Sequence, residues 1–172
     1  MKSYNKISKP ILNEFLNLLG KESVLTDKES LFNYGHDETE NFSYPPEVLV
    51  KPGSVEQVSI IMKLANQYNI PVTPIGAMTG LSGGSLSIHG GIGISMERFN
   101  KILKIDEDNL QVHVQPGVIT QVLQDEVAKK GLYYAPDPAS RGSCFIGGNF
   151  AENSGGPRAV KYGVTKDFVL NL

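Results

Sequence analysis

The sequence predicts an α+β protein, and three observations support this prediction. Short apolar stretches alternate with a helical pattern between residues 46 and 100. Two apolar stretches near residues 102–114 flank a polar turn, which is typical of a β-hairpin. Many of the 18 glycines gather in two stretches, residues 75–84 and 136–157, rather than scattering along the chain. We therefore expect two small α/β subdomains, each carrying one glycine-rich segment.

Composition fits an ordinary soluble globular protein that can bury a core. The chain has 172 residues, of which 40% are apolar and 20% charged. The net charge of -2 gives no basic footprint for nucleic acid. The single cysteine, Cys144, excludes an internal disulfide framework and a cysteine-rich zinc site. No signal-peptide pattern is present, and no apolar run reaches the roughly 18 residues of a transmembrane segment. We expect a cytoplasmic protein, or one peripheral to a membrane.

The first 45 residues predict a helical segment. Pro10 suits the first turn of a helix, and Ile11, Phe15, Leu18 and Leu19 recur at helical spacing until Gly20. A short second helix is expected over residues 28–34, followed by a loop over residues 38–46.

Residues 46–100 predict a first subdomain. Strands are expected at residues 48–50, 71–73 and 92–95. Between the first two, Ser54 and Gln57 predict a capping box that begins a helix ending at Tyr68 or Asn69. The expected core face of this helix is Val55, Val58, Met62 and Ala65. A connection this short implies parallel strands.

Residues 101–172 predict a second subdomain. The hairpin strands are residues 102–105 and 110–114. A helix follows with Ile119, Val122, Leu123 and Val127 on one face, and Gly131 ends it. Residues 168–172 predict a last strand.

The first glycine-rich segment predicts a binding site for a phosphate group. It follows a predicted strand and runs from Pro74 to Gly84. Glycines let successive backbone N–H groups turn toward one anion without a Cβ in the way, and Thr79 and Ser82 add hydroxyl donors. The alternative is a mobile loop or a run of tight turns. A nucleoside-triphosphate P-loop is excluded because no Gly-Lys-Ser/Thr ending is present, and the glycine spacing does not match the Gly-x-Gly-x-x-Gly dinucleotide fingerprint.

The second glycine-rich segment runs from Pro136 to Asn149 and continues to Pro157. A loop of this length in a compact domain is usually functional or disordered. Apolar residues among the glycines, including Phe145 and Ile146, argue against disorder. Two anion-binding segments separated by a hairpin and a helix suggest one extended ligand that is held from two sides.

From about Pro46 onward, the chain resembles the FAD-linked oxidase family related to vanillyl-alcohol oxidase. It is most similar to the branch that contains D-lactate dehydrogenase and the FAD-binding subunit of glycolate oxidase. The motifs that carry the resemblance are Gly76-Ala77, Thr79-Gly80-Leu81-Ser82-Gly83-Gly84, Gln115-Pro116-Gly117, Tyr134-Ala135-Pro136-Asp137-Pro138-Ala139-Ser140, Ile146-Gly147-Gly148-Asn149, Ala151-Glu152-Asn153-Ser154-Gly155-Gly156-Pro157 and Lys161-Tyr162-Gly163.

The resemblance implies a two-part flavin domain with FAD between the parts. Residues 75–84 resemble the loop around the pyrophosphate, and residues 138–149 the wall along the ribityl and isoalloxazine groups. The candidate FAD-binding residues are Ile75, Gly76, Ala77, Met78, Thr79, Gly80, Leu81, Ser82, Gly83, Pro116, Gly117, Pro138, Ala139, Gly142, Ser143, Cys144, Ile146, Gly147, Gly148, Asn149 and Ala151. Met78 stands where many relatives carry glycine, so a positive φ there would be strained.

Other residues predict structural roles. His36 precedes Asp37-Glu38, but one histidine with two carboxylates is more typical of a solvated loop than of a metal site. His113 is expected to point outward from a strand, and His89 to lie on a surface loop. Because neither glycine-rich segment contains histidine, we expect noncovalent FAD. Tyr133 and Tyr134 are expected to pack in the core, and Arg141 to be mostly solvated.

The resemblance implies an oxidoreductase that oxidises a D-2-hydroxy acid and passes electrons to an acceptor. Relatives continue beyond the position of Leu172 into a substrate domain, so we expect this chain to be the N-terminal portion of a larger enzyme and to be inactive alone. No catalytic residue and no metal ligand is assigned, and the oligomeric state is left open. Two alternatives are a noncatalytic cofactor-binding fragment and a phosphate- or nucleotide-binding protein that uses these loops without flavin.

Overall fold

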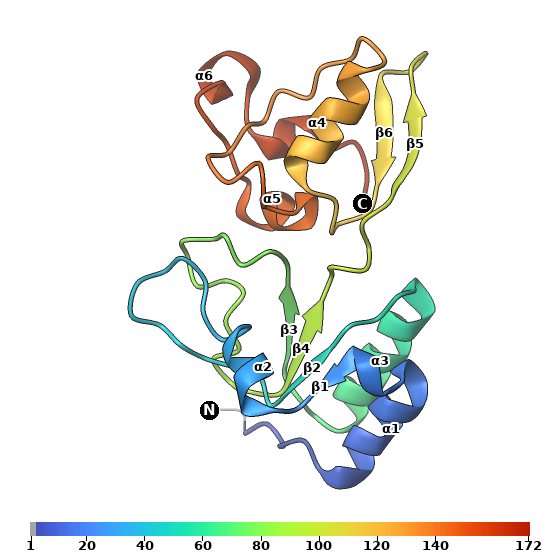
Figure 1. The fold of residues 1–172 in the computed structure, drawn as a ribbon, viewed down its shortest axis with the longest axis vertical. Helices are drawn as coiled ribbons and strands as arrows, with labels where there is room; N and C mark the ends of the chain where they lie inside the picture. Colours follow the sequence, from blue (N-terminus) through green and yellow to red (C-terminus); the bar gives the residue numbers. More distant parts are fainter. Residues whose placement is uncertain (1–2) are drawn as a thin grey trace. The chain divides into compact units, whose positions relative to one another are not determined.

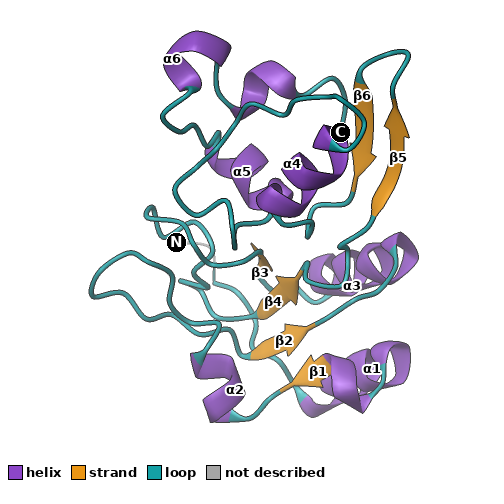
Figure 2. Cartoon of the chain, turned by 45° about the horizontal axis from the view of Figure 1, so that its top comes forward, coloured by secondary structure: helices purple, strands orange, loops and turns teal. Residues whose placement is uncertain are grey.

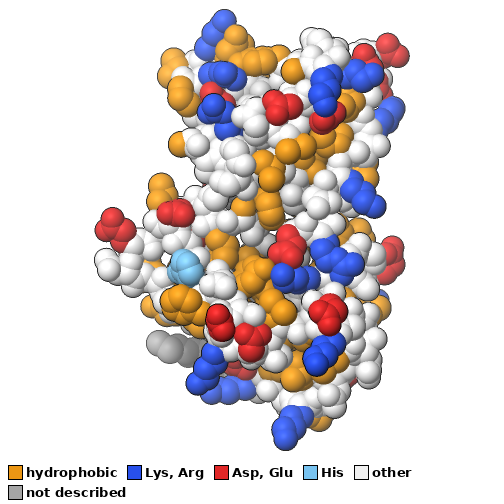
Figure 3. Space-filling model, viewed as in Figure 1, with side chains coloured by type: hydrophobic (Ala, Val, Ile, Leu, Met, Phe, Trp, Pro, Cys, Tyr) orange, Lys and Arg blue, Asp and Glu red, His pale blue; other side chains and the backbone are white. Residues whose placement is uncertain are grey.

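The computed structural model describes residues 3–172, which form two compact units that meet between Arg98 and Phe99. Each unit contains one small sheet and its own helices (Figure 1). On the face shown in Figure 3, basic and acidic side chains are mixed, as expected for a net charge of -2.

The first unit is built on a four-stranded sheet with the strand order β1-β2-β4-β3. The strands are β1 (Val24–Leu25), β2 (Val48–Val50), β3 (Val72–Ile75) and β4 (Ile92–Ser95). Strand β4 pairs in parallel with both β2 and β3, whereas β1 pairs antiparallel with β2. The predicted parallel strands are therefore confirmed, and their carboxyl ends meet at one edge of the sheet.

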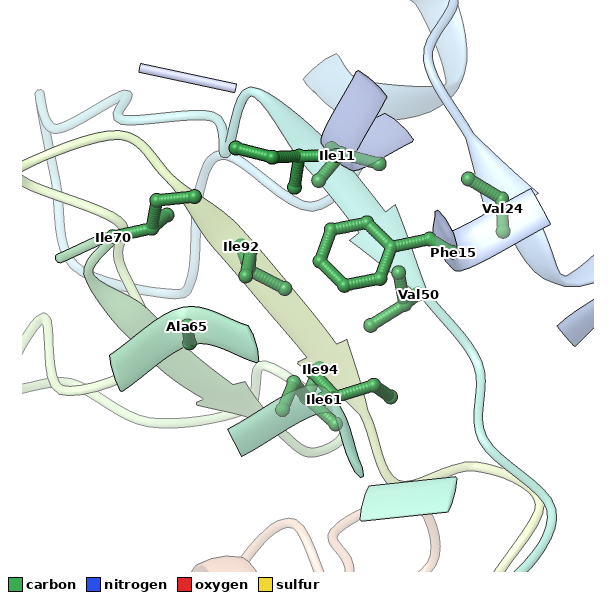
Figure 4. Packing of buried hydrophobic residues seen from close by; sticks show 10 residues of the cluster. Ile11, Phe15, Val24, Val50, Ile61, Ala65, Ile70, Ile92 and Ile94 are labelled. Carbon is green, nitrogen blue, oxygen red and sulfur yellow. The ribbon is translucent and has the colours of Figure 1, made fainter. Parts of the chain in front are cut away.

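Helices cover both faces of this sheet. One face packs on α1 (Lys9–Leu19) and α3 (Val55–Gln67), and Phe15 lies at the centre of this core against strand residues such as Val50 (Figure 4). The other face carries Leu49 and Ile75, which pack against Leu31 of α2 (Lys28–Phe32). Two apolar faces explain why the strand residues are almost continuously hydrophobic.

The capping of α3 follows the prediction in part. The Ser54 side chain accepts the N–H of Gln57, but the Gln57 side chain accepts from Gly53 rather than from Ser54. The predicted core face is wrong at two positions, because Val55 and Met62 are 69% and 47% exposed. The helix buries Ala65, as predicted, and Ile61, which was not predicted. The sequence holds two overlapping apolar stripes, and packing against α1 and the sheet selects the second one.

The second unit combines a hairpin with short helices (Figure 2). Strands β5 (Ile102–Asp106) and β6 (Gln111–Val114) pair antiparallel, as predicted. The helices are α4 (Thr120–Ala128), α5 (Ile146–Glu152) and α6 (Ala159–Tyr162), and a 3-10 turn follows at Thr165–Phe168. The first unit has its own 3-10 turn at Lys21–Ser23. The core of the unit consists of Val118, Leu123, Val127 and Ile146.

Two predictions for the second unit are wrong. Residues 146–149, expected to be loop, begin α5, because Ile146 is buried in the core and anchors the turn despite two following glycines. Residues 168–172 form no strand, because no described strand pairs with them. Phe168 instead packs edge-on against Tyr134, with ring centroids 5.6 Å apart.

Gly91 and Gly20 distinguish two reasons why a position requires glycine, namely a positive φ and a lack of space for a Cβ atom. Both have positive φ, +72° and +79°. A Cβ at Gly91 would collide with the carbonyl oxygen of Pro71, whereas nothing lies within 4 Å of a Cβ at Gly20. We expect Gly20→Ala to lower the free energy of unfolding by about 1 kcal/mol and Gly91→Ala by about 3 kcal/mol or more, measured by urea denaturation. Equal losses of stability in the two variants would show that the backbone at Pro71 can move away from the added Cβ at little energetic cost.

Candidate functional site

The first candidate segment lies at the carboxyl edge of the parallel sheet. Residues 76–84 follow β3 directly, and Figure 1 shows this loop leaving the end of that strand. Ile75, the last residue of the strand, is fully buried and so fixes where the loop begins. Ligands of open α/β sheets bind at such an edge, because loops and backbone N–H groups converge there.

The backbone of this loop offers unused hydrogen-bond donors. In the described chain, no N–H group of residues 76–81 donates to another residue. These residues are partly or fully exposed, so the donors are accessible. Unpaired N–H groups gathered on one short segment form a site suited to an anion with several oxygens.

Two backbone contacts fix the far end of the loop. The N–H of Gly83 donates to the Asp37 carboxylate at 3.1 Å, and the N–H of Glu38 donates to the carbonyl of Gly80 at 3.1 Å. The loop is therefore attached to the segment that follows α2. Sequence reasoning missed Asp37 because these partners lie 46 residues apart in the chain.

Met78 adopts the conformation that the sequence flags as strained. Its φ is +58°, in the left-handed region. The side chain packs against the cluster of Leu31, Leu49 and Ile75. Packing of the side chain thus accompanies a backbone conformation that costs roughly 1–2 kcal/mol for an L-residue.

A partly buried ion pair lies at the same edge of the sheet. Lys51 follows β2 and Glu97 follows β4, and their charged groups are 2.8 Å apart. Tyr34 and Ser95 each donate to the Glu97 carboxylate at 3.1 Å. Burial opposes the charge on both groups, but these bonds outweigh it, so the pKa of Lys51 is raised and that of Glu97 lowered. Both groups therefore stay charged at neutral pH.

The second candidate segment joins α5 to the turn before α4. The N–H of Ile146 donates to the carbonyl of Val118 at 2.9 Å, and the N–H of Gly147 to that of Pro116 at 2.8 Å. A Cβ at Gly147 would lie 2.7 Å from the Pro116 side chain, so only glycine allows this approach. Gly148, by contrast, is exposed and faces open space.

Two of the predicted site residues, Cys144 and Asn149, have side chains in the interior of the second unit. The Asn149 amide donates to Thr120 at 2.6 Å, and the Thr120 hydroxyl lies 3.2 Å from the Cys144 sulfur. All three residues are at most 3% exposed. Their side chains therefore stabilise the fold of the second unit. Ala139, Gly142, Ser143 and Gly148 remain exposed.

A second acidic residue holds the end of this segment. Asp137 is 6% exposed, and its carboxylate is 3.1 Å from the guanidinium of Arg158. Gly156 runs directly against the Asp137 backbone, where a side chain could not fit. The motif around Asp137 is thus fixed to the motif around Gly156.

The remaining candidates have local partners. His36 contacts the Phe32 carbonyl at 3.1 Å, and His113 is exposed on β6, as predicted. Arg141 donates to Gln121. Tyr133 is 57% exposed, so its predicted core position is wrong, whereas Tyr134 packs beside the core of the second unit. Among residues 3–172, no helix is long and apolar enough to cross a membrane, and no three metal-binding side chains cluster.

The strain at Met78 can be measured with two truncations. Met78→Ala and Met78→Gly both remove the packing of the side chain, but only glycine relieves the positive φ. We expect the glycine variant to be more stable than the alanine variant by about 1 kcal/mol in denaturant titrations, the reverse of the usual order. An alanine variant of equal or greater stability would contradict the strained conformation.

The buried phenol of Tyr134 is expected to make the second unit less stable at alkaline pH. Burial, helped by the nearby Cys144, raises the pKa of Tyr134 to about 12. The folded state therefore favours the neutral phenol, and stability present below the unfolded pKa of 10.0 is lost as pH rises toward 12. The buried hydroxyl has no hydrogen-bond partner in the described chain. We expect Tyr134→Phe to be as stable as the wild type at pH 7. Between pH 10.0 and about 12 it should lose less of its folded circular-dichroism signal than the wild type.

Several known proteins are similar to this chain in sequence. A family model described as an FAD binding domain matches residues 46–172. D-lactate dehydrogenase of Anaerostipes hadrus is 44% identical over 167 residues, which cover 96% of this chain and 35% of that protein. Glycolate oxidase subunit GlcD of Bacillus subtilis is 37% identical over 96% of this chain and 35% of its own length. D-2-hydroxyglutarate dehydrogenase of Stutzerimonas stutzeri is 39% identical over 94% of this chain and 35% of its own length.

Solved structures show the same fold. Alkyldihydroxyacetonephosphate synthase superposes with a TM-score of 0.85 at 22% identity, over 99% of this chain and 33% of that one. p-Cresol methylhydroxylase superposes with a TM-score of 0.72 at 26% identity, over 83% of this chain and 29% of that one. The chain thus spans about a third of the length of the curated relatives it matches. These matches show that the chain belongs to the FAD-binding domain family of FAD-linked oxidoreductases, as its glycine-rich motifs indicated.

Proposed function

We propose that residues 75–83 hold the diphosphate of FAD through backbone N–H groups. The observation that carries this proposal is the run of unpartnered donors at residues 76–81, directly after a parallel strand. The hydroxyls of Thr79 and Ser82 add donors of the same kind. Gly83 contributes its backbone conformation, with φ +73°, since its N–H donates to Asp37.

The second part of the proposal concerns the segments of the second unit. Pro116, Gly117 and residues 138–151 are proposed to lie along the ribityl and isoalloxazine groups. The support is the close packing at Gly147, which fixes the backbone there, and the open space beside Gly148 and Gly142. An exposed glycine with nothing near its missing Cβ leaves room for a ligand to approach the backbone.

The proposed mode of attachment is noncovalent. Neither glycine-rich segment contains a histidine, and the one cysteine of the chain is buried against Thr120. The buried thiol is thus engaged in packing and is poorly placed for attack on a cofactor.

The proposed reaction of the whole protein is the oxidation of a D-2-hydroxy acid. The three relatives described above are named for D-lactate, glycolate and D-2-hydroxyglutarate, which share a hydroxyl beside a carboxylate. When bound, FAD supplies the redox chemistry by accepting a hydride. The described residues bind and orient the cofactor, and a separate electron acceptor completes the cycle. The lone cysteine favours the reducing cytoplasm as the place of action.

Binding of FAD by the purified chain is the first test. We expect added FAD to change its fluorescence and absorbance on binding, with saturation at one equivalent. If the loop recognises the diphosphate, ADP and inorganic pyrophosphate should compete with FAD, and AMP should compete less well. A chain that is folded by circular dichroism and leaves the flavin spectrum unchanged would contradict the proposed site.

Gly148→Ala separates the site from the fold. Alanine favours a helix over glycine by about 1 kcal/mol, so stability should rise or stay unchanged. The added methyl would enter the space assigned to FAD, and we expect an affinity at least several-fold weaker in fluorescence titrations. The matched control is Gly147→Ala, which should lose stability because of Pro116. Unchanged FAD affinity in Gly148→Ala would remove this segment from the site.

The substrate class requires the protein encoded by the complete reading frame. We expect it to reduce an acceptor dye with one of D-lactate, glycolate or D-2-hydroxyglutarate, and not with L-lactate. The 172-residue chain with FAD should show no turnover. Robust turnover by this chain alone would contradict its assignment as a cofactor-binding part.

A further inference from the structure

Asp37 is the most buried carboxylate beside the loop of residues 76–84. It lies outside the part of the chain that the family model matches. It is 9% exposed, whereas its neighbours His36 and Glu38 are exposed. The family match begins at residue 46. The segment of residues 36–44, called the brace here, therefore belongs to the preceding part of the chain and still contacts the loop.

Both carboxylate oxygens of Asp37 accept backbone N–H groups. One oxygen accepts from Thr39 at 2.9 Å, which orders the brace itself, and the other accepts from Gly83 at 3.1 Å. Hydrogen bonds to an ionised acceptor are about twice as strong as neutral ones. A single side chain thus joins the brace to the loop.

Two backbone hydrogen bonds extend this contact: the N–H of Glu38 donates to Gly80, and the N–H of Ser87, just after the loop, donates to Tyr44. The N–H of Tyr44 donates to Gly35 and so joins the two ends of the brace. The brace and the loop accordingly run side by side beyond the sheet, as Figure 1 shows for the blue and green loops. Among the described residues, Asp37 is the one side chain of the brace that hydrogen-bonds to the loop.

The brace determines which way the loop donors face. The peptide between Gly80 and Leu81 is trans, so its carbonyl and its N–H point in opposite directions. Since the Gly80 carbonyl points to Glu38, the Leu81 N–H points away from the brace. At the next anchor the Gly83 N–H points to Asp37. Two fixed peptides on either side of Ser82 leave the intervening backbone little freedom.

We propose that Asp37 is a positioning residue for FAD, which holds the loop of residues 76–83 in the conformation that presents its N–H groups to the diphosphate. This inference rests on the proposed role of that loop. The carboxylate does not contact FAD in this proposal and acts through Gly83. Its negative charge, taken alone, would repel a diphosphate, so the positioning effect must outweigh the repulsion.

This opposition makes Asp37→Asn a sharp test. Asparagine has nearly the same shape but one acceptor oxygen, so it cannot accept from both Thr39 and Gly83. If Asp37 acts by positioning, we expect FAD affinity in fluorescence titrations to fall at least tenfold. If its main effect were charge, removing the negative charge would strengthen FAD binding. Unchanged or tighter binding overturns the proposal.

Asp27→Asn is the matched control. Asp27 lies in the same part of the chain and accepts the N–H of Ser30 at 2.8 Å, where it begins α2. The substitution removes the same charge and also disturbs a side-chain cap, but it leaves the loop contact intact. We expect FAD affinity within twofold of the wild type. A loss equal to that of Asp37→Asn would assign the effect to general destabilisation and overturn the proposal.

A second measurement does not depend on FAD. Amide hydrogen exchange of the free chain reports the bond between Gly83 and Asp37 directly. We expect the Gly83 amide to exchange at least tenfold faster in Asp37→Asn, while amides of β4 keep their rates. If the wild-type chain fails to bind FAD, the proposed function fails, and exchange still decides whether Asp37 orders the loop. Unchanged exchange at Gly83 contradicts the brace.

Discussion

The parallel pairing of β3 with β4 is the constraint on which the candidate site depends. Its register ends at Ile75 and Ser95, and the next backbone bond, from Met96 to Ile75, closes the ladder. Beyond this point β3 has no strand partner in the described chain, so the N–H groups of the following loop form no ladder bonds. The same edge carries Lys51 and Glu97, because β2 is also parallel to β4. A loop with unpaired backbone donors and an ion pair therefore arise from one topological choice.

Sequence patterns correctly predicted the elements whose ends are set by nearby proline, glycine or turn residues. Pro10 and Gly20 bound α1, and the polar turn before Gln111 separates the hairpin strands. Elements defined by distant contacts were harder to predict. The buried face of α3 depends on α1, and the helical turn at Ile146 depends on a core built from Val118 and Leu123. An apolar pattern at residues 168–172 predicted a strand, but a strand needs a partner, which periodicity cannot supply.

The candidate site divides in the same way. Glycine-rich composition identified residues 75–84, because the ability to place N–H groups around an anion is a local property of the backbone. The contact from Asp37 to Gly83 crosses 46 positions, and nothing in the spacing around Asp37 signals it. His36 and the two acidic residues after it were expected to lie on a solvated loop; His36 and Glu38 are exposed, but Asp37 is buried and its carboxylate accepts two N–H groups. The positive φ of Met78 was flagged by residue type alone, and the packing that accompanies it required the structure.

Recognition through the backbone also limits what these residues can select. The N–H groups of residues 76–81 are the same whatever side chains the loop carries, so the diphosphate site proposed there does not depend on the substrate. The exposed candidate residues of the second segment, Ala139, Gly142, Ser143, Gly148 and Ala151, carry no titratable side chain. A hydroxy acid is recognised by its carboxylate, and discrimination between a methyl and a longer acidic side chain requires side-chain contacts. Relatives named for D-lactate, glycolate and D-2-hydroxyglutarate can therefore share these segments, and the choice among such substrates must depend on groups other than these.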